Sequence, residues 1–212
     1  MKIELASTAQ SAEIASLIME AMNYECCQNL AGPNHTLADF YRLMCALVAR
    51  DDSQYSYRNT LVALSDNPWT SEHGEPMEGR GVLMGCCVSY DGALLHQLRQ
   101  AFIDGAREEF GIDYTGMADE TEPGELYIDS ICVGSEFRHQ GVATALLQAT
   151  IDKACRLGID KVALLVDKGN PRAEHLYNKV GFRYEKDTSW GGHAMKKLTL
   201  HPSRTPLGQS VV

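Results

Sequence analysis

Apolar residues along this chain recur with two different periods, and each period predicts a different kind of element. Spacings of three and four predict helices over residues 8–23, 36–50, 92–110, 141–157 and 171–179. Short apolar or alternating runs predict strands over residues 2–5, 60–65, 82–90, 125–133, 161–167, 182–186 and 193–198. The stretches 67–79 and 111–124 are polar and are predicted to be loops. This order of elements indicates a mixed α/β pattern with one central sheet.

In the predicted strand 125–133, the alternation of apolar and polar residues changes phase part-way along. Its first half alternates apolar residues with Glu125, Tyr127 and Asp129, whereas its second half has apolar residues of the opposite parity at Ile131 and Val133. A β-bulge between residues 129 and 131 would return the apolar side chains to one face; the alternative is a strand end that is buried on both faces. A bulge leaves backbone N–H groups without ladder partners, and such donors can bind a thioester carbonyl.

A turn and a helix start follow this strand directly. The sequence there is Arg138-His139-Gln140-Gly141-Val142-Ala143, whose small residues at 141 and 143 allow a ligand to approach the backbone closely. Free N–H groups at a helix N-terminus favour an anion such as a pyrophosphate. The segment is neither a G-x-G-x-x-G motif nor a Walker loop, and taken alone it is also compatible with an ordinary helix start.

An asparagine and a tyrosine mark the helix that follows the next strand. Asn170 precedes Pro171, the usual arrangement of an N-cap and a first helical residue. Tyr177 lies two turns along on the same face as Asn170. Asn170 could also hydrogen-bond an amide-rich ligand, and the Tyr177 hydroxyl could protonate a departing thiolate. Each residue has a structural alternative, as a helix cap and as a core tyrosine.

In their order and spacing, these strand, turn and helix motifs resemble those of the GNAT superfamily of N-acetyltransferases. The resemblance covers roughly residues 125–185 and is carried by the strand 131–133, the turn 138–143, Asn170-Pro171-x-Ala173 and Leu176-Tyr177-x-x-x-Gly181-Phe182. It implies a GNAT-like α/β (α+β) fold, with a strongly bent mixed sheet flanked by helices and, in this chain, a helical insertion before the cofactor-binding strand. It also implies acetyl-coenzyme A (acetyl-CoA) as co-substrate and direct attack by an amine on the thioester, so that the cysteines are not nucleophiles.

The resemblance further implies roles for particular residues. The backbone at Ile131, Cys132 and Val133 would hold the acetyl group and the pantetheine arm. Asn170 would contact the cofactor, and Tyr177 would contact it and act as the general acid. The pyrophosphate would be held by the backbone at Arg138, His139, Gln140, Gly141, Val142, Ala143 and Thr144.

The group that takes the proton from the amine is left open. Asp129 is the first candidate because it lies on the polar face just before the predicted bulge, a face that Glu125 and Tyr127 share. The same face equally suits the binding of a cationic acceptor. The segment 91–124 is predicted to cover the acceptor side. Its acidic end is interpreted as a solvated loop, with attraction of a cation as the alternative; the residues concerned are Asp113, Asp119, Glu120 and Glu122.

Composition narrows the class of partner. The 212-residue chain has a formal net charge of -9, which disfavours nucleic acid because phosphate contacts need clustered Lys and Arg. Negative charge suits a cationic acceptor, or simply keeps the protein in solution. No apolar run could span a bilayer and the N-terminus lacks a signal-peptide pattern, so a cytoplasmic protein without a membrane partner is expected. The seven cysteines suit neither a disulfide framework nor a metal site.

The expected protein is a single domain over residues 1–200 with a flexible tail at 201–212, present as a monomer or a homodimer. Its expected function is transfer of the acetyl group of acetyl-CoA to a primary amine of a small molecule or a peptide. The alternative is a non-catalytic acetyl-CoA-binding sensor or interaction protein with the same fold. Tyr177 and the polar face of the strand favour the enzyme.

Overall fold

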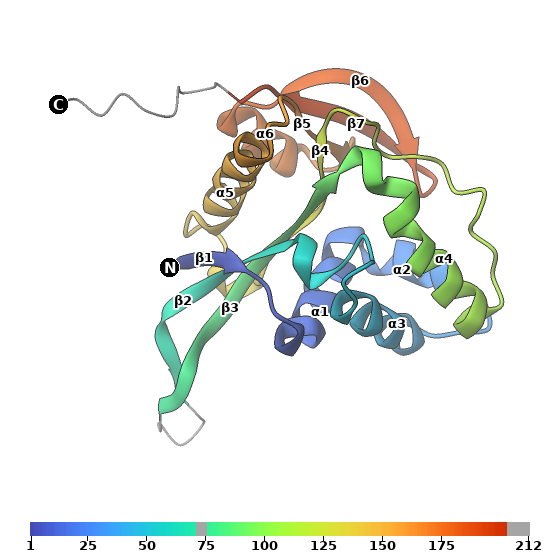
Figure 1. Ribbon diagram of the computed structural model, residues 1–212, viewed down its shortest axis with the longest axis horizontal. Coiled ribbons are helices and arrows are strands. Elements are labelled where there is room, and N and C mark those ends of the chain that lie inside the picture. Colours follow the sequence, from blue (N-terminus) through green and yellow to red (C-terminus); the bar gives the residue numbers. More distant parts are fainter. Residues whose placement is uncertain (71–75, 203–212) are drawn as a thin grey trace.

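One mixed β-sheet runs through the computed structural model, which describes residues 1–70 and 76–202 (Figure 1). Within these residues the strand order is β1-β2-β3-β4-β5-β7-β6. The pair β4–β5 is parallel, and the other neighbouring strands are antiparallel. The strands are β1 (Lys2–Leu5), β2 (Thr60–Thr70), β3 (Pro76–Asp91), β4 (Leu126–Val133), β5 (Val162–Asp167), β6 (Arg183–Trp190) and β7 (His193–Leu200).

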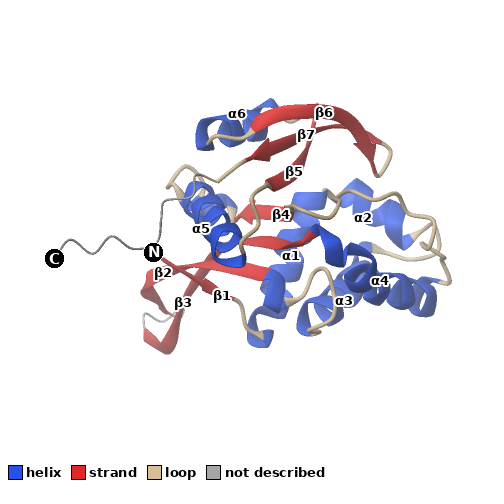
Figure 2. Ribbon diagram, turned by 45° about the horizontal axis from the view of Figure 1, so that its top comes forward, coloured by secondary structure: helices blue, strands red, loops and turns tan. Residues whose placement is uncertain are grey.

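Helices cover both faces of this sheet (Figure 2). Neighbouring residues of a strand point to opposite faces, so Val62 packs with the helices α1 to α4 and Ala63 packs with α5 and α6. The α-helices of the described residues are α1 (Ser11–Met22), α2 (Tyr24–Ala31), α3 (Leu37–Ala49), α4 (Leu95–Phe110), α5 (Val142–Leu157) and α6 (Pro171–Val180). The predicted fold class, a mixed sheet flanked by helices with a helical insertion before β4, is confirmed.

Two local predictions were wrong. Helix α2 was not predicted; it exists because Asn23, at φ 64°, turns the chain and accepts a hydrogen bond from the Cys26 N–H at 2.8 Å. The stretch 67–79 is not a loop at its two flanks, because β2 runs to Thr70 and β3 begins at Pro76. The middle of that stretch, residues 71–75, and residues 203–212 of the predicted tail lie outside the described residues.

The segment between β3 and β4 contains α4 and is fastened to the sheet at its end by Glu125. This carboxylate is fully buried; its Oε1 lies 2.8 Å from Lys197 Nζ and its Oε2 lies 2.9 Å from Lys161 Nζ. Burial alone would raise the pKa of Glu125, but the hydrogen bonds from Lys197 and Lys161 outweigh burial and lower that pKa. Glu125 is therefore held as a charged anchor between the insertion and the sheet.

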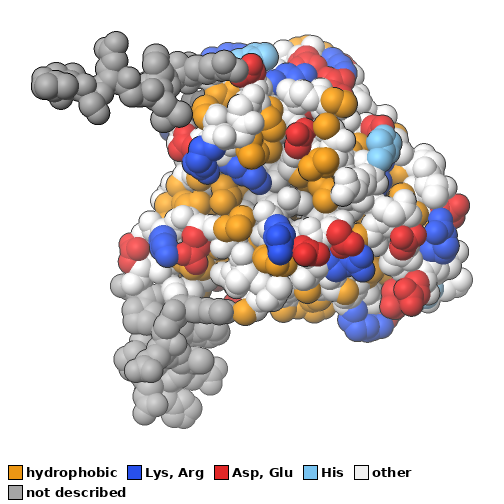
Figure 3. Space-filling view, viewed as in Figure 1, with side chains coloured by type: hydrophobic (Ala, Val, Ile, Leu, Met, Phe, Trp, Pro, Cys, Tyr) orange, Lys and Arg blue, Asp and Glu red, His pale blue; other side chains and the backbone are white. Residues whose placement is uncertain are grey.

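On the face of the molecule seen in Figure 3, acidic and basic side chains are interspersed, so that face has no large patch of one sign. No helix in residues 1–70 or 76–202 combines the length and the apolar character needed to cross a membrane.

Replacing Glu125 by Gln should lower the free energy of unfolding by about 3 kcal/mol at neutral pH, because it leaves Lys197 buried without its closest carboxylate. The folded-state pKa of Glu125 is lowered, so its stabilisation is present above the unfolded-state pKa and is lost as the pH falls through the folded-state pKa. In urea unfolding, the difference between wild type and variant should shrink on acidification. A difference that does not change with pH would contradict the charged anchor.

Candidate active site

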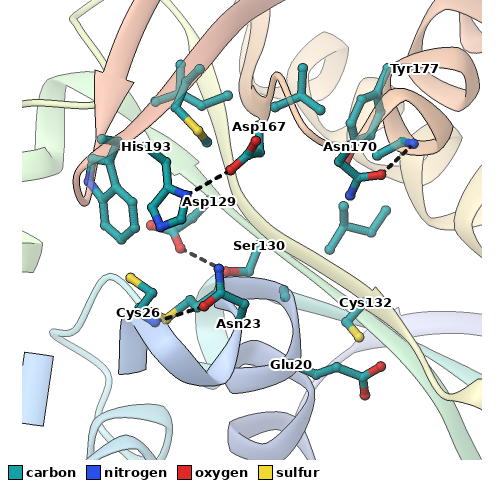
Figure 4. Close-up of a pocket in the computed structure, with 18 of the residues that line it drawn as sticks. Glu20, Asn23, Cys26, Asp129, Ser130, Cys132, Asp167, Asn170, Tyr177 and His193 are labelled. Atoms are coloured by element: carbon teal, nitrogen blue, oxygen red, sulfur yellow. Dashed lines mark hydrogen bonds and ion pairs between the residues drawn. The ribbon is translucent and has the colours of Figure 1, made fainter. Parts of the chain in front are cut away.

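The two parallel strands β4 and β5 separate soon after they meet. Among the described residues their pairing lasts for three residue pairs, from Leu126–Val162 to Ile128–Leu164. Beyond Ile128 the edge of β4 that faces β5 therefore has no ladder partner on that strand. The space between the strands opens into a cavity of about 480 Å³ (Figure 4).

Asp129 forms the bulge that the change of phase predicted. Val88 of β3 pairs with Ser130, and the next residue, Ser89, pairs with Ile128, so Asp129 is passed over in the ladder. This confirms the bulge rather than the alternative of a regular strand buried on both faces. The Asp129 side chain lines the cavity, where it accepts a hydrogen bond from Tyr90 of β3.

The cavity brings together most of the predicted site residues. Those that line it are Tyr127, Asp129, Ile131, Cys132, Val133, Arg138, Ala143, Asn170 and Tyr177. His139, Gln140, Gly141, Val142 and Thr144 are not among its lining residues; they form the adjoining turn and the first turn of α5. Glu125, which was expected to bind substrate, does not line the cavity because its carboxylate is buried against Lys161 and Lys197.

The turn before α5 leaves the helix N-terminus open. Gly141 has φ 83°, and a Cβ placed on it would meet no atom within 4 Å. His139 also has a positive φ, 61°, which is uncommon for a residue with a side chain. Among the described residues, no side chain caps the first N–H groups of α5. These bare amides, with Arg138 of the same turn lining the cavity, fit the phosphates of a coenzyme A molecule.

Asn170 and Tyr177 line the opposite wall from α6. The Asn170 Oδ1 accepts a hydrogen bond from the Ala173 N–H at 3.1 Å, so this side chain is the predicted N-cap. Tyr177 packs edge-on against Phe182, with ring centroids 6.0 Å apart, and is 8% exposed. Burial raises the pKa of Tyr177, so its hydroxyl stays protonated at neutral pH.

Asp129 is the centre of a hydrogen-bond network at the inner end of the cavity. Ser130 Oγ donates to its Oδ1 at 3.0 Å, and its Oδ2 accepts from Tyr90 Oη at 3.1 Å and from Gln54 Nε2 at 3.2 Å. Burial raises the pKa of Asp129, and these hydrogen bonds act in the opposite direction. Asp129 is thus a desolvated carboxylate with three donors, next to the open edge of β4.

Glu120 is also part of this network, which overturns its interpretation as a residue of a solvated loop. It is 7% exposed, lines the cavity and forms an ion pair with the buried guanidinium of Arg99. Tyr90 Oη lies 3.3 Å from Glu120 Oε1, so one hydroxyl contacts both carboxylates. Burial, and next the charge of Asp129, raise the pKa of Glu120 to about 7.

Two further residues of the cavity, Asp167 and His193, were not anticipated from the sequence. Asp167 ends β5, His193 begins β7, and His193 Nδ1 lies 3.1 Å from Asp167 Oδ2 (Figure 4). The cavity cysteines are poor nucleophiles, because burial raises the pKa of the Cys132 thiol to about 12 and also raises that of Cys26.

A sheet that splits beside a bulge, with an uncapped helix start at the split, defines a coenzyme A-dependent acyltransferase fold. The chain belongs to the GNAT acetyltransferase family, whose family model matches residues 58–182. The resemblance inferred from the motifs is thereby confirmed, and it extends upstream of the segment in which those motifs lie.

Individual relatives share shorter stretches with this chain. A chloroplastic GCN5-related N-acetyltransferase 6 of Arabidopsis thaliana is 37% identical over 57 residues, which are 27% of this chain and 20% of that protein. Mycothiol acetyltransferase of Propionibacterium freudenreichii subsp. shermanii is 36% identical over 81 residues, 37% of this chain and 25% of that protein. The chain thus matches a quarter or less of either relative's length.

The whole fold has counterparts among solved structures. An N-acetyltransferase from Staphylococcus aureus Mu50 superposes with a TM-score of 0.73 at 20% sequence identity, over 94% of this chain and 100% of that chain. At this identity the likeness shows a shared fold, including the segments outside the matched family region.

Proposed function

We propose that this protein transfers the acetyl group of acetyl-CoA directly to a primary amine of a small molecule or a peptide. The observation that carries the proposal is a single cavity that joins the open edge of β4, at Ile131 to Val133, with the buried carboxylates Asp129 and Glu120. The open edge of β4 suits a thioester carbonyl, and the two carboxylates suit an amine.

On the coenzyme side, the chain offers backbone amides together with the Arg138 side chain. The amides at the start of α5, behind Gly141, would hold the pyrophosphate, and the unpaired edge of β4 from Ile131 to Val133 would hold the pantetheine arm and the acetyl carbonyl. Asn170 caps α6 through its Oδ1, which leaves its Nδ2 free to donate to the arm. When bound, acetyl-CoA supplies an activated acetyl group.

Tyr177 is the proposed general acid. Its hydroxyl is protonated at neutral pH, as in any tyrosine, and burial raises its pKa further; the side chain lines the cavity opposite β4. As the carbon–sulfur bond breaks, the hydroxyl would give its proton to the departing thiolate. No acyl-enzyme is needed, in keeping with the raised pKa of the Cys132 thiol.

The acceptor side is acidic and aromatic. Asp129 and Glu120 would attract an ammonium group, and the rings of Tyr55, Tyr127 and Trp190 line the same cavity and suit contact with a cation. Glu125 takes no part, since its carboxylate neutralises two lysines away from the cavity.

A panel of primary amines, diamines, amino acids and peptides with free N-termini would test the proposal, with release of coenzyme A thiol from acetyl-CoA as the readout. At least one class should give turnover well above the rate of acetyl-CoA hydrolysis. Tight binding of acetyl-CoA by calorimetry, without turnover on any amine, would instead support the binding-only alternative.

Replacing Tyr177 by Phe should lower kcat by about 100-fold while the affinity for acetyl-CoA is nearly kept, because the change removes one hydroxyl and leaves the ring in place. Steady-state kinetics and calorimetry would separate the two effects. Tyr184→Phe is the matched control, since Tyr184 is 56% exposed and does not line the cavity. An unchanged kcat in the Tyr177 variant would remove this residue from the acid role.

Replacing Gly141 by Val should weaken acetyl-CoA binding by more than about 10-fold, because the side chain would strain a backbone at φ 83° and occupy the space in front of the helix amides. Gly158→Val at the other end of α5 is the control, with φ 71° and equally open space. Both variants should lose stability, but only the first should lose affinity in calorimetry. Equal affinities would argue against coenzyme binding at this turn.

A further inference from the structure

His193 and Asp167 form an oriented pair inside the cavity. Asp167 Oδ1 accepts a hydrogen bond from the Gly169 N–H at 2.6 Å, and its Oδ2 contacts His193 Nδ1 at 3.1 Å. One carboxylate thus uses one oxygen to fix its own position and the other to fix the imidazole. The side chain of Asp167 is 39% exposed and that of His193 is 37% exposed, so the pair lies at the accessible part of the cavity rather than in the core.

This contact determines which nitrogen of His193 can take up a proton. A carboxylate beside Nδ1 favours the tautomer with the hydrogen on that nitrogen, which leaves a lone pair on Nε2. In Figure 4 the ring extends from Asp167 into the cavity with Nε2 on the side away from that carboxylate. No described residue forms a hydrogen bond with Nε2.

Asp129 is the other candidate for taking up the proton, but its carboxylate oxygens already accept hydrogen bonds. Its carboxylate already accepts hydrogen bonds from Gln54, Tyr90 and Ser130, and such bonds favour its charged form. Asp129 is therefore suited to attracting and holding a cation, whereas His193 presents an unoccupied acceptor nitrogen.

We infer that His193 is the general base for the acceptor amine and that Asp167 is its positioning residue. The inference rests on the proposed function and deepens it. As the lone pair of the neutral amine forms the nitrogen–carbon bond, His193 Nε2 takes the proton that the nitrogen must lose. The electron pair of the breaking carbon–sulfur bond goes to sulfur, which takes its proton from Tyr177. Solvent then restores both side chains.

The charged and titratable groups that share the cavity with His193 come from several elements. They are Glu20 of α1, Cys26 of α2, Tyr55 before β2, Glu120 before β4, Tyr127, Asp129 and Cys132 of β4, Arg138 before α5, Asp167 of β5 and Tyr177 of α6. Four of these are carboxylates and one is a guanidinium, so carboxylates predominate among the charged groups of the cavity.

The test replaces His193 by Ala in the full chain and measures turnover with the best amine of the panel. The inference expects a loss of about 100-fold in kcat/KM, unchanged acetyl-CoA affinity and partial recovery on addition of free imidazole, which can enter the space left by the side chain. His96→Ala is the matched control, because His96 also contacts an aspartate, Asp119, at 3.1 Å but lies outside the cavity.

A second variant, Asp167→Asn, tests the positioning role. It should lower kcat by about 10-fold with little change in KM, and ¹⁵N NMR of His193 should show a shift of the tautomer away from the Nδ1-protonated form. Asp129→Asn should instead raise KM for the amine. An unchanged tautomer and unchanged kcat in Asp167→Asn would remove Asp167 from this role.

The outcomes separate the inference from the proposed function. If wild type turns over no amine, the proposed function fails and the inference falls with it. If wild type is active, retained activity in His193→Ala overturns the inference alone. Lost activity that imidazole does not restore, in a folded variant with normal acetyl-CoA affinity, also overturns it in favour of a structural role for the ring.

Discussion

Beyond Ile128, β4 and β5 no longer satisfy each other's backbone groups, and the rest of the site depends on this separation. A buried N–H group without a partner costs about 1 to 3 kcal/mol, so the open edge of β4 favours any ligand that brings hydrogen-bond acceptors. The bulge at Asp129 lies at the point where the pairing with β5 ends. The extra residue turns the Asp129 side chain into the space that the separation opens. The open donors of β4 and the position of the Asp129 carboxylate are therefore consequences of the same irregularity.

The separation persists because both faces of β4 are packed just before it. Leu126 and Ile128, just before the split, are buried in the core beneath α5 and α6, whereas Tyr127 packs on the other face in a small cluster with Tyr90 and Leu95. Closing the gap would require one of these packed layers to move as a body, because close-packed interiors do not deform continuously. The cavity is thus built into the fold rather than formed by a flexible loop.

Features that depend on short-range order were predictable from the sequence, and features that depend on distant partners were not. The parity change at Asp129 and the capping Asn170 are local patterns with a local cause, so the bulge and the start of α6 were predicted. The burial of Glu120 depends on Arg99, 21 residues earlier in the chain, and nothing in the acidic segment itself signals it. His193 and Asp167 meet only because β7 returns beside β5, a pairing that spacing along the chain does not reveal.

The arrangement of charge along the cavity bears on how the proposed reaction would place its two molecules. The uncapped start of α5 presents partial positive charge beside the Arg138–Glu20 ion pair, and Glu120, Asp129 and Asp167 present carboxylates elsewhere in the cavity. A phosphate-bearing molecule is attracted to the helix start and repelled by these carboxylates, while an ammonium group has the opposite preference. The net charge of the chain therefore matters less than the distribution of charge inside the cavity, where Arg99 forms an ion pair with Glu120. In the proposed reaction, this distribution of charge would orient both molecules before any specific contact forms.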